Sequence, residues 1–365
     1  MSLRFRNLNR SVLLLAVLVI AVAVVGYLLK KREAPPTSLS QLLSAYGIDT
    51  PERKAALELL MRQSGILQPG ASFDDLFPKR SHTDDVFKDL LSFIQLTQER
   101  FTVRTGKQER WEVERPPWMD ANPEALRSAL DQLGMIKEVG PRLRDVDVLV
   151  ILGARFSTME ERLNYASRLY TKSLIKPTQL VLLAGERRVT VGIDGSAEEL
   201  EAIAKKHGVS DLTETHLIQE AYQASSLFGR LPVDVIDTPR GDLPRPTTET
   251  TTLEFVNWLK NHPTFERAVF VSNQPHVKYQ QAVISEVLRN QDQVVDFEVV
   301  GSASHAHAKI EELVGAFGST LWAMTPNVVR KAKLIPKDPS LRQAFLQLYA
   351  KQPLIYKNVE TLLGG

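Results

Sequence analysis

Strand-length apolar runs alternate with helical stretches through the second half of this chain, and no other feature of the sequence restricts the fold as strongly. The first run is apolar without interruption, which is typical of a strand covered on both faces of a parallel sheet. The runs span residues 146–152, 179–184, 233–237, 267–273 and 294–300. The pattern predicts an α/β fold with a doubly wound, mostly parallel sheet of about five strands.

Helical spacing of apolar residues fills the intervals between these runs and continues on both flanks. The intervening helices are expected at 159–173, 197–207, 213–228, 248–262, 277–289 and 307–317. Together the strands and helices predict an α/β domain over 145–330 and a C-terminal helical tail over 331–365. Before them, residues 39–135 read as a helical region that Pro and Gly divide into several short helices, with packing or partner contact as its expected role.

Residues 11–29 are apolar and uncharged, and at about 1.5 Å per residue they nearly match a hydrocarbon core of roughly 30 Å. We interpret them as one transmembrane helix between an N-terminal tail (1–10) and a linker (30–38). The alternative is a cleaved signal peptide, but its apolar core is shorter, roughly 7 to 15 residues. Basic residues balance on the two sides, so only the shortness of the tail favours an extracytoplasmic or periplasmic body.

The formal net charge of +2 hides an uneven distribution. The first 32 residues hold six of the 45 Lys and Arg and none of the 43 Asp and Glu, which leaves 39 against 43, or −4, for the remainder. A mildly acidic body without a basic stripe argues against nucleic-acid binding, which neutralises phosphates with clustered Lys and Arg. The absence of cysteine excludes disulfides, thiolate zinc sites and thiol catalysis.

Polar side chains collect where the predicted strands end, and ligands of open α/β sheets bind at such carboxyl ends. The fourth run ends in Asn273, Gln274 and His276, which we take as one wall of a site. The first run leads to Gly153 and a helix start at Glu160 and Glu161, where the free amides could bind a phosphate or the glutamates simply complement the helix dipole. Neither GxGxxG nor a Walker lysine is present.

The second and third junctions offer further candidates. Gly185 follows the second run, as a plain turn or as a site residue. After the third run, Arg245 precedes a threonine-rich helix start in which Thr251 and Glu254 fit a capping box. The surplus of threonines predicts a site that binds a phosphate or a carboxylate. The alternative is that these threonines are ordinary polar residues of a turn.

Histidine spacing gives little indication of a metal. His305 and His307 lie one residue apart near a helix start, but HExxH spacing and an evident third ligand are both missing. We therefore predict no metal site. His276 differs through its polar neighbours, and the alternative is that it only stabilises the loop.

Several of these residues resemble the motifs of the YdcF, SanA and ElyC family. The matching positions are Gly153, Glu161, Arg162, Gly185, Thr248, Glu249 and His276. The sequence departs from the family pattern at Ala154, Ala184, Thr250 and Lys278 or Tyr279, as in a divergent member. The resemblance covers about 145–318 and implies a Rossmann-like domain behind a membrane segment, linked to envelope integrity and lipid-carrier metabolism. Nucleotide or S-adenosylmethionine binding is implied for some members, and no cofactor is identified for this chain.

These observations predict a single-pass membrane protein that binds a small phosphorylated, nucleotide-like or lipid-linked ligand at the strand ends. The expected catalytic residues are Glu161 or Glu249 as general base and His276 as donor. The expected ligand-binding residues are Gly153, Arg162, Gly185, Arg245, Thr248, Asn273 and Gln274. The alternative is a catalytically silent anchored scaffold whose helical region, 39–135, binds a protein partner.

Overall fold

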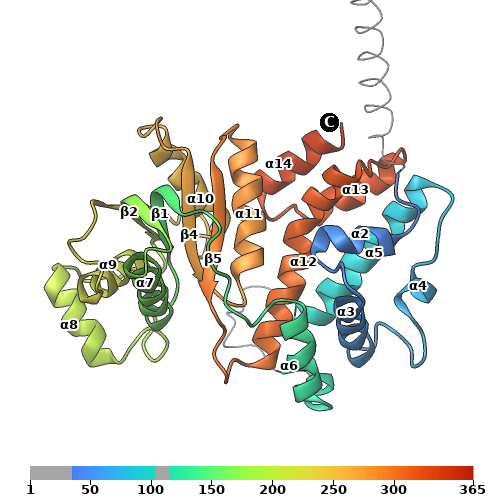
Figure 1. The fold of residues 1–365 in the computed structure, drawn as a ribbon, viewed down its shortest axis with the longest axis horizontal. Coiled ribbons are helices and arrows are strands. Elements are labelled where there is room, and N and C mark those ends of the chain that lie inside the picture. The colour runs from blue at the N-terminus through green and yellow to red at the C-terminus, as the bar shows by residue number, and fades with distance from the viewer. Residues whose placement is uncertain (1–34, 103–114, 365) are drawn as a thin grey trace, which may run out of the picture. The chain divides into compact units, whose positions relative to one another are not determined.

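The apolar runs form one sheet in which every strand pair is parallel (Figure 1). The structure is a computed structural model that describes residues 35–102 and 115–364. The strands are β1 (Asp145–Leu152), β2 (Lys176–Gly185), β3 (Val233–Thr238), β4 (Arg267–Asn273) and β5 (Asp296–Ser302). Their order is β3-β2-β1-β4-β5. The predicted α/β class is thus confirmed, and the strand order is that of a Rossmann-like fold.

The last strand begins two residues later than predicted. Val294 was assigned to the run for its apolar side chain, but it is 96% exposed. The strand instead continues through Gly301 and Ser302, which pair with Ser272 and Asn273 of β4. An apolar residue beside a turn is therefore a weak marker of a strand boundary.

Two helices cover the first face of the sheet. Helix α7 (Phe156–Thr171) packs on β1, β4 and β5, and α9 (Glu214–Ala224) packs on β2 and β3. Helix α8 (Ala197–His207) lies on α9. Leu149, Leu163 and Leu182 belong to the core that these elements enclose, and each is almost fully buried.

The second face is covered more thickly. Helices α10 (Thr248–Leu259) and α11 (Val277–Asn290) pack on the sheet, and α12 (Ile310–Ala332) packs on α11. The outer elements are α2 (Leu39–Leu42), η1 (Leu43–Tyr46), α3 (Pro51–Gln63), α4 (Phe73–Leu76), α5 (Thr83–Phe101), η3 (Pro117–Asp120), α6 (Pro123–Gln132), α13 (Pro339–Gln347) and α14 (Pro353–Leu362). Their apolar side chains and those of α10–α12 form one continuous core, so Thr37–Gly365 is a single compact unit.

Helix α12 is much longer than the predicted 307–317 segment. Gly318 and Pro326 look like helix breakers in the sequence, yet both are buried inside the helix. A Cβ at Gly318 would lie 2.9 Å from Phe101 Cβ, so the glycine permits close contact with α5. The helix extends to Ala332, past the predicted end of the α/β domain at residue 330.

The predicted membrane span, residues 11–29, lies outside the described residues. Among residues 35–102 and 115–364, no helix combines the length and apolarity that crossing a membrane requires.

Candidate functional site

The chain order reverses between β1 and β4, and in open α/β sheets ligands bind outside the carboxyl ends of the strands at such a point. Most of the predicted site residues lie in the segments that follow these strand ends. What they contact there differs from one junction to the next.

Arg162 fills the space between β1 and β4. It is 2% exposed and lies on α7. Its Nη1 donates to the carbonyl oxygens of Leu152 and Gly153, each at 2.7 Å. Its Nε and Nη2 donate to Asn273 Oδ1 at 3.0 and 2.7 Å. In this structure the two residues, both predicted to bind a ligand, bind each other and connect α7 to the strand ends.

Gly153 lies against a residue that the sequence did not single out, Glu214. A Cβ at Gly153 would lie 2.0 Å from Glu214 Oε1 and 3.1 Å from Ala184 Cα. Only glycine leaves room for the carboxylate here. Glu214 is the first residue of α9, so the connection between β2 and β3 places an acid over the end of β1.

Glu214 belongs to a buried ionic network centred on Arg187. Arg187 Nε donates to Glu214 Oε2 at 2.7 Å, while Nη1 and Nη2 donate to the two carboxylate oxygens of Asp194 at 2.9 and 2.8 Å. Nη2 also donates to the Ala154 carbonyl at 3.0 Å. The side chains are at most 12% exposed. This planar, two-pronged pairing is the geometry that arginine offers to carboxylates or phosphates.

The charges in this network shift one another's pKa values. Burial raises the pKa of Glu214 above its ordinary value, although Arg187, Arg162 and Arg245 oppose the change. Burial also acts to raise the pKa of Asp194, but the hydrogen bonds and charge of Arg187 outweigh it and lower that pKa. The pKa of Arg187 is raised, because its two acidic partners outweigh the effect of burial. Arg187 and Asp194 therefore form an ion pair. Glu214 is the group of this network in which burial favours the protonated form.

Asp194 also occupies the start of α7. The Phe156 backbone contributes a hydrogen bond that lowers the pKa of Asp194, and Phe156 is the first residue of that helix. The N-terminus of the helix that follows β1 is where many doubly wound folds bind a phosphate. Here a carboxylate from the chain itself contributes the negative charge.

The third junction uses its threonines for helix capping. The capping box is formed by Thr247 and Thr250, not by Thr251 and Glu254 as predicted. Thr251 and Thr252 donate their hydroxyls to the carbonyl oxygen of Thr248 at 3.2 and 2.6 Å. These hydroxyls therefore form hydrogen bonds within the first turn of α10 itself. The number of threonines in the sequence could not reveal this.

Gly185 of the second junction and Glu249 of the third lie in close contact with their surroundings. A Cβ at Gly185 would lie 2.6 Å from the Thr238 carbonyl oxygen and 2.7 Å from Pro246 Cγ. Glu249 is buried and accepts a hydrogen bond from Ile355 N at 3.2 Å, so it contacts the first turn of α14. Arg245 is half-buried, and its charge acts on Glu214.

The polar residues after β4 connect the sheet to the N-terminal helices. Gln274 Nε2 donates to the carbonyl oxygens of Gly134 and Lys137 at 3.1 and 2.9 Å. Lys278 Nζ donates to the Leu133 carbonyl at 2.7 Å, and burial followed by the charge of Arg53 lowers its pKa. These contacts stabilise the end of α6 against α11. His276 is the N-cap residue of α11, and its backbone amide donates to Asn273 O at 2.9 Å.

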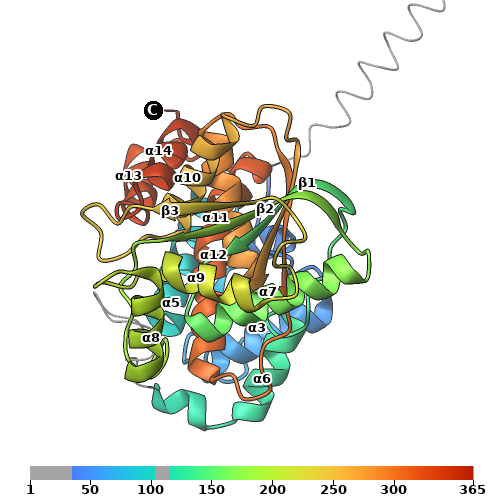
Figure 2. The ribbon, with the colours of Figure 1, turned by 90° about the vertical axis from the view of Figure 1, so that its left-hand side faces the viewer.

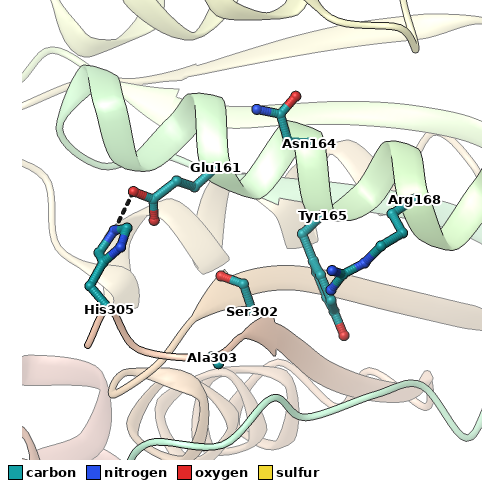
Figure 3. A pocket seen from close by; sticks show the side chains of 7 residues that line it. All are labelled: Glu161, Asn164, Tyr165, Arg168, Ser302, Ala303 and His305. Atoms are coloured by element: carbon teal, nitrogen blue, oxygen red, sulfur yellow. Dashed lines mark hydrogen bonds and ion pairs between the residues drawn. The ribbon is translucent and has the colours of Figure 1, made fainter.

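Glu161 faces an open pocket beyond the end of β5, and its imidazole partner there is His305 (Figure 3). His305 Nε2 lies 2.5 Å from Glu161 Oε1. The cavity measures about 250 Å³. It is lined by Glu161, Asn164, Tyr165, Arg168, Ser302, Ala303 and His305. His305, which was considered from the sequence only as a metal ligand, thus forms this carboxylate–imidazole pair, which is a common arrangement for proton transfer.

The other polar groups of this pocket come from α7 and β5. Glu161, Tyr165 and Arg168 lie one helical turn apart on the same side of α7, as Figure 3 shows. Arg168 pairs with Glu138 at 2.6 Å, and Tyr165 donates to the Val139 carbonyl at 2.9 Å. The Ser302 Oγ is buried without a hydrogen-bond partner in the described structure. A ligand with acceptor oxygens would find a guanidinium, an imidazole and a hydroxyl here.

Sequence reasoning missed Glu214, Arg187, Asp194 and the pairing of His305. Arg187 directly follows the Gly185 junction, which was the available signal, but its partners lie 7 and 27 positions away. Among the described residues, no group of three His, Asp or Glu side chains could hold a metal ion.

Comparison with known proteins adds no family to these observations. No family model matches the chain, and neither the curated proteins nor the solved structures contain a significant match.

Proposed function

We propose that this chain binds a small phosphorylated ligand in the pocket between α7 and the end of β5, and that Glu161 and His305 transfer a proton there. The observation that carries the proposal is the 2.5 Å contact between the Glu161 carboxylate and the His305 imidazole at the rim of an open cavity. A carboxylate that orients an imidazole is a recurrent acid–base arrangement.

The size of the cavity favours a small group. The cavity of about 250 Å³ is slightly below the usual range for drug-sized ligands, roughly 300 to 1,000 Å³. A phosphate or the phosphate head of a lipid-linked molecule fits this volume, with its remainder in the open mouth. Arg168 and His305, which pair with Glu138 and Glu161, supply N–H donors, and Ser302 supplies a buried hydroxyl without a partner in the described structure.

Arg162 and Asn273 support this site from behind. Arg162 follows Glu161 directly, and its four hydrogen bonds fix the register of α7 against β1 and β4. Fixing α7 also fixes the direction in which Glu161 points. On this proposal, Arg162 positions the catalytic pair and does not contact the ligand.

The proposal includes a membrane anchor and an extracytoplasmic position for the body. Its support is the uncharged apolar stretch of residues 11–29 together with the resemblance to envelope proteins. Protease added to cells in which the cytoplasmic membrane is the only remaining barrier should degrade the body if it lies outside that membrane. Protection of the body until the membrane is disrupted would contradict this orientation.

The ligand is tested on the full chain in mild detergent. Inorganic phosphate, a nucleoside monophosphate and a short-chain polyprenyl phosphate are titrated separately while thermal unfolding is recorded. A ligand at about 100 times its dissociation constant should add roughly 2.7 kcal/mol to the free energy of unfolding. His305→Ala and Arg168→Ala should abolish this gain. His307→Ala is the matched control, because His307 is an exposed histidine of the same loop and does not line the pocket.

A shift of equal size in His305→Ala would refute this pocket as the site. A shift by polyprenyl phosphate alone would identify a lipid-linked ligand, and equal shifts by all three compounds would identify the phosphate as the recognised group.

A second candidate function is a catalytically silent scaffold, which a separate observation favours. The helix start after β1, the usual phosphate position of such folds, already holds Asp194 and its partner Arg187. A scaffold needs no ligand there. Absence of any ligand shift, together with a stable complex formed through the outer surface of residues 39–135, would select this alternative.

A further inference from the structure

The two edge strands of the sheet differ in how the chain covers them. On the β5 side, Val139 and Gly301 exchange backbone hydrogen bonds of 2.9 and 3.0 Å. Glu298 of β5 also accepts from the amides of Arg142 and Leu143, both at 2.8 Å. On the other side, β3 pairs only with β2, and no other described strand flanks it. Figure 2 looks toward this side of the sheet. Uncovered edges are templates for another strand.

The outward backbone groups of β3 belong to Val233, Val235 and Asp237. Leu180 N donates to Pro232 O at 2.9 Å and Glu186 N to Thr238 O at 3.0 Å, so even-numbered positions face β2. Backbone direction alternates along a strand, which turns the odd-numbered amides and carbonyls away from the sheet. In the described part of the chain, these three residues make no backbone hydrogen bonds on that side.

Exposed apolar side chains accompany these backbone groups. Val233 is 37% exposed and Val235 38%. Their side chains lie on the same face as Asp237, which accepts from Thr215 of α9 at 2.6 Å. Phe228, just after α9, is 57% exposed, and its ring centroid lies 5.4 Å from that of Tyr222.

We propose that β3 pairs with β3 of a second copy of this chain, antiparallel, with the two-fold axis at Val235. A two-fold axis perpendicular to the sheet keeps each side chain on its own face. Because directly opposed residues share a face, the axis must lie at a residue and not between two residues. Centring on Val235 uses every outward amide and carbonyl of the three residues. Centring on Ile236 would place Val233 opposite Pro239, which has no N–H to donate.

The side chains fit this register. Val235 faces its own copy, Val233 faces Asp237, and Asp234 faces Ile236, so no two acids are directly opposed. Asp234 is already held by Trp258 Nε1 at 2.9 Å and Gln179 Nε2 at 3.1 Å. Pairing would therefore bury apolar surface without placing like charges together, and it would join two sheets into one.

The register makes a distance prediction that a chain without cysteine can test directly. Directly opposed residues of a hydrogen-bonded antiparallel pair have Cα atoms about 5.5 Å apart, within disulfide range. The two copies of Val233 would be offset by four residues along the strand, roughly 14 Å at about 3.4 Å per residue, beyond that range.

The experiment uses the full chain in mild detergent. Sedimentation velocity should show a concentration-dependent dimer. Under mild oxidation, Val235→Cys should form a covalent dimer at least tenfold faster than Val233→Cys, its control of equal exposure on the same face. Val294→Cys, at the other end of the sheet, measures cross-linking by random collision.

Val235→Lys should weaken the dimer at least tenfold, because it places two ammonium groups opposite each other. A wild-type chain that stays monomeric at all concentrations would overturn the proposal. This is the result expected if another segment or another protein covers the edge. Equal cross-linking rates of Val235→Cys and Val233→Cys, or a dimer that Val235→Lys leaves unchanged, would overturn it as well.

Discussion

The carboxyl edge of the sheet has a closed half and an open half. Over β1 and β2, Arg187, Asp194 and Glu214 satisfy one another, and their side chains are almost fully buried. Beyond β5, Glu161 and His305 make a similarly short contact, but the His305 side chain is 71% exposed. The two halves use the same kinds of residue. What separates a structural ion network from a candidate site is whether solvent reaches one side of it.

Among the variants that test this contrast, one that removes Arg187 should change the free energy of unfolding most. Arg187→Ala leaves Asp194 and Glu214 buried without their cation, which should lower the free energy of unfolding by about 3–5 kcal/mol. Urea denaturation measures the loss. Arg168→Ala, which removes a half-exposed ion pair of the open half, is the control and should cost less than about 1 kcal/mol. Equal losses would mean that the two halves do not differ as described.

A methyl group at Gly153 should have the next largest effect. The added Cβ of Gly153→Ala would overlap the Glu214 carboxylate, and relieving the overlap should cost about 1–3 kcal/mol. Gly140→Ala is the control, since no atom lies within 4 Å of its Cβ, and its effect should stay within about 0.5 kcal/mol. Thermal unfolding of both variants compares them. If Gly153→Ala left the free energy of unfolding unchanged, this would show that Glu214 has room to move.

Glu214 should also make stability depend on pH. Because burial raises its pKa above 4.5, the folded chain keeps a proton that the unfolded chain has lost. This contribution is complete below about pH 4.5 and disappears as the pH rises through the folded-state pKa. Asp194 acts in the opposite direction, but only near and below its ordinary pKa of 3.8. The pKa values of Glu160 and His216 are also shifted, so the contribution of Glu214 is the difference between Glu214→Gln and the wild type.

Glu214→Gln should therefore gain stability relative to the wild type as the pH rises, by at most about 1.4 kcal/mol per pH unit. Denaturation at several pH values from 5 to 8 measures the difference. A difference that does not change with pH would show that Glu214 is ionised throughout this range.

The smallest effect on stability is expected in the open half. His305→Ala removes a contact at an exposed rim, so the free energy of unfolding should fall by less than about 1 kcal/mol. Chemical denaturation without ligand provides the measurement. A loss as large as that of Arg187→Ala would assign His305 to the fold instead of to the pocket.

The strands were predictable because their apolar runs report burial directly. The boundaries of β4 agree with the prediction at both ends, since Ala268–Val271 is continuously buried and polar residues flank it. Gly153 and Gly185 were recognised as strand-end glycines. The reason for each is a close approach of Glu214 or Thr238, and such neighbours are distant in the sequence.

The role of polar residues was less predictable than their position. Asn273 was singled out at a strand end, and Arg162 on the following helix through the family resemblance, both as ligand-binding residues. Hydrogen-bond partners depend on tertiary geometry, and in the structure these two bind each other. The surplus threonines after Arg245 mostly serve their own helix. The Arg187 network was beyond reach, because no periodicity fixes the path of the long connection between β2 and β3.

The shared core of the second face has a consequence for synthesis. Phe87 of α5 packs edge-on against Phe345 of α13, and Tyr46 hydrogen-bonds to Thr325 of α12 at 2.8 Å. The helices that leave the ribosome first are therefore completed by the helices that leave it last. Contacts across more than 250 positions form slowly, so the early helices must wait with apolar faces uncovered. A nascent chain stalled before residue 325 should be a strong substrate for chaperones.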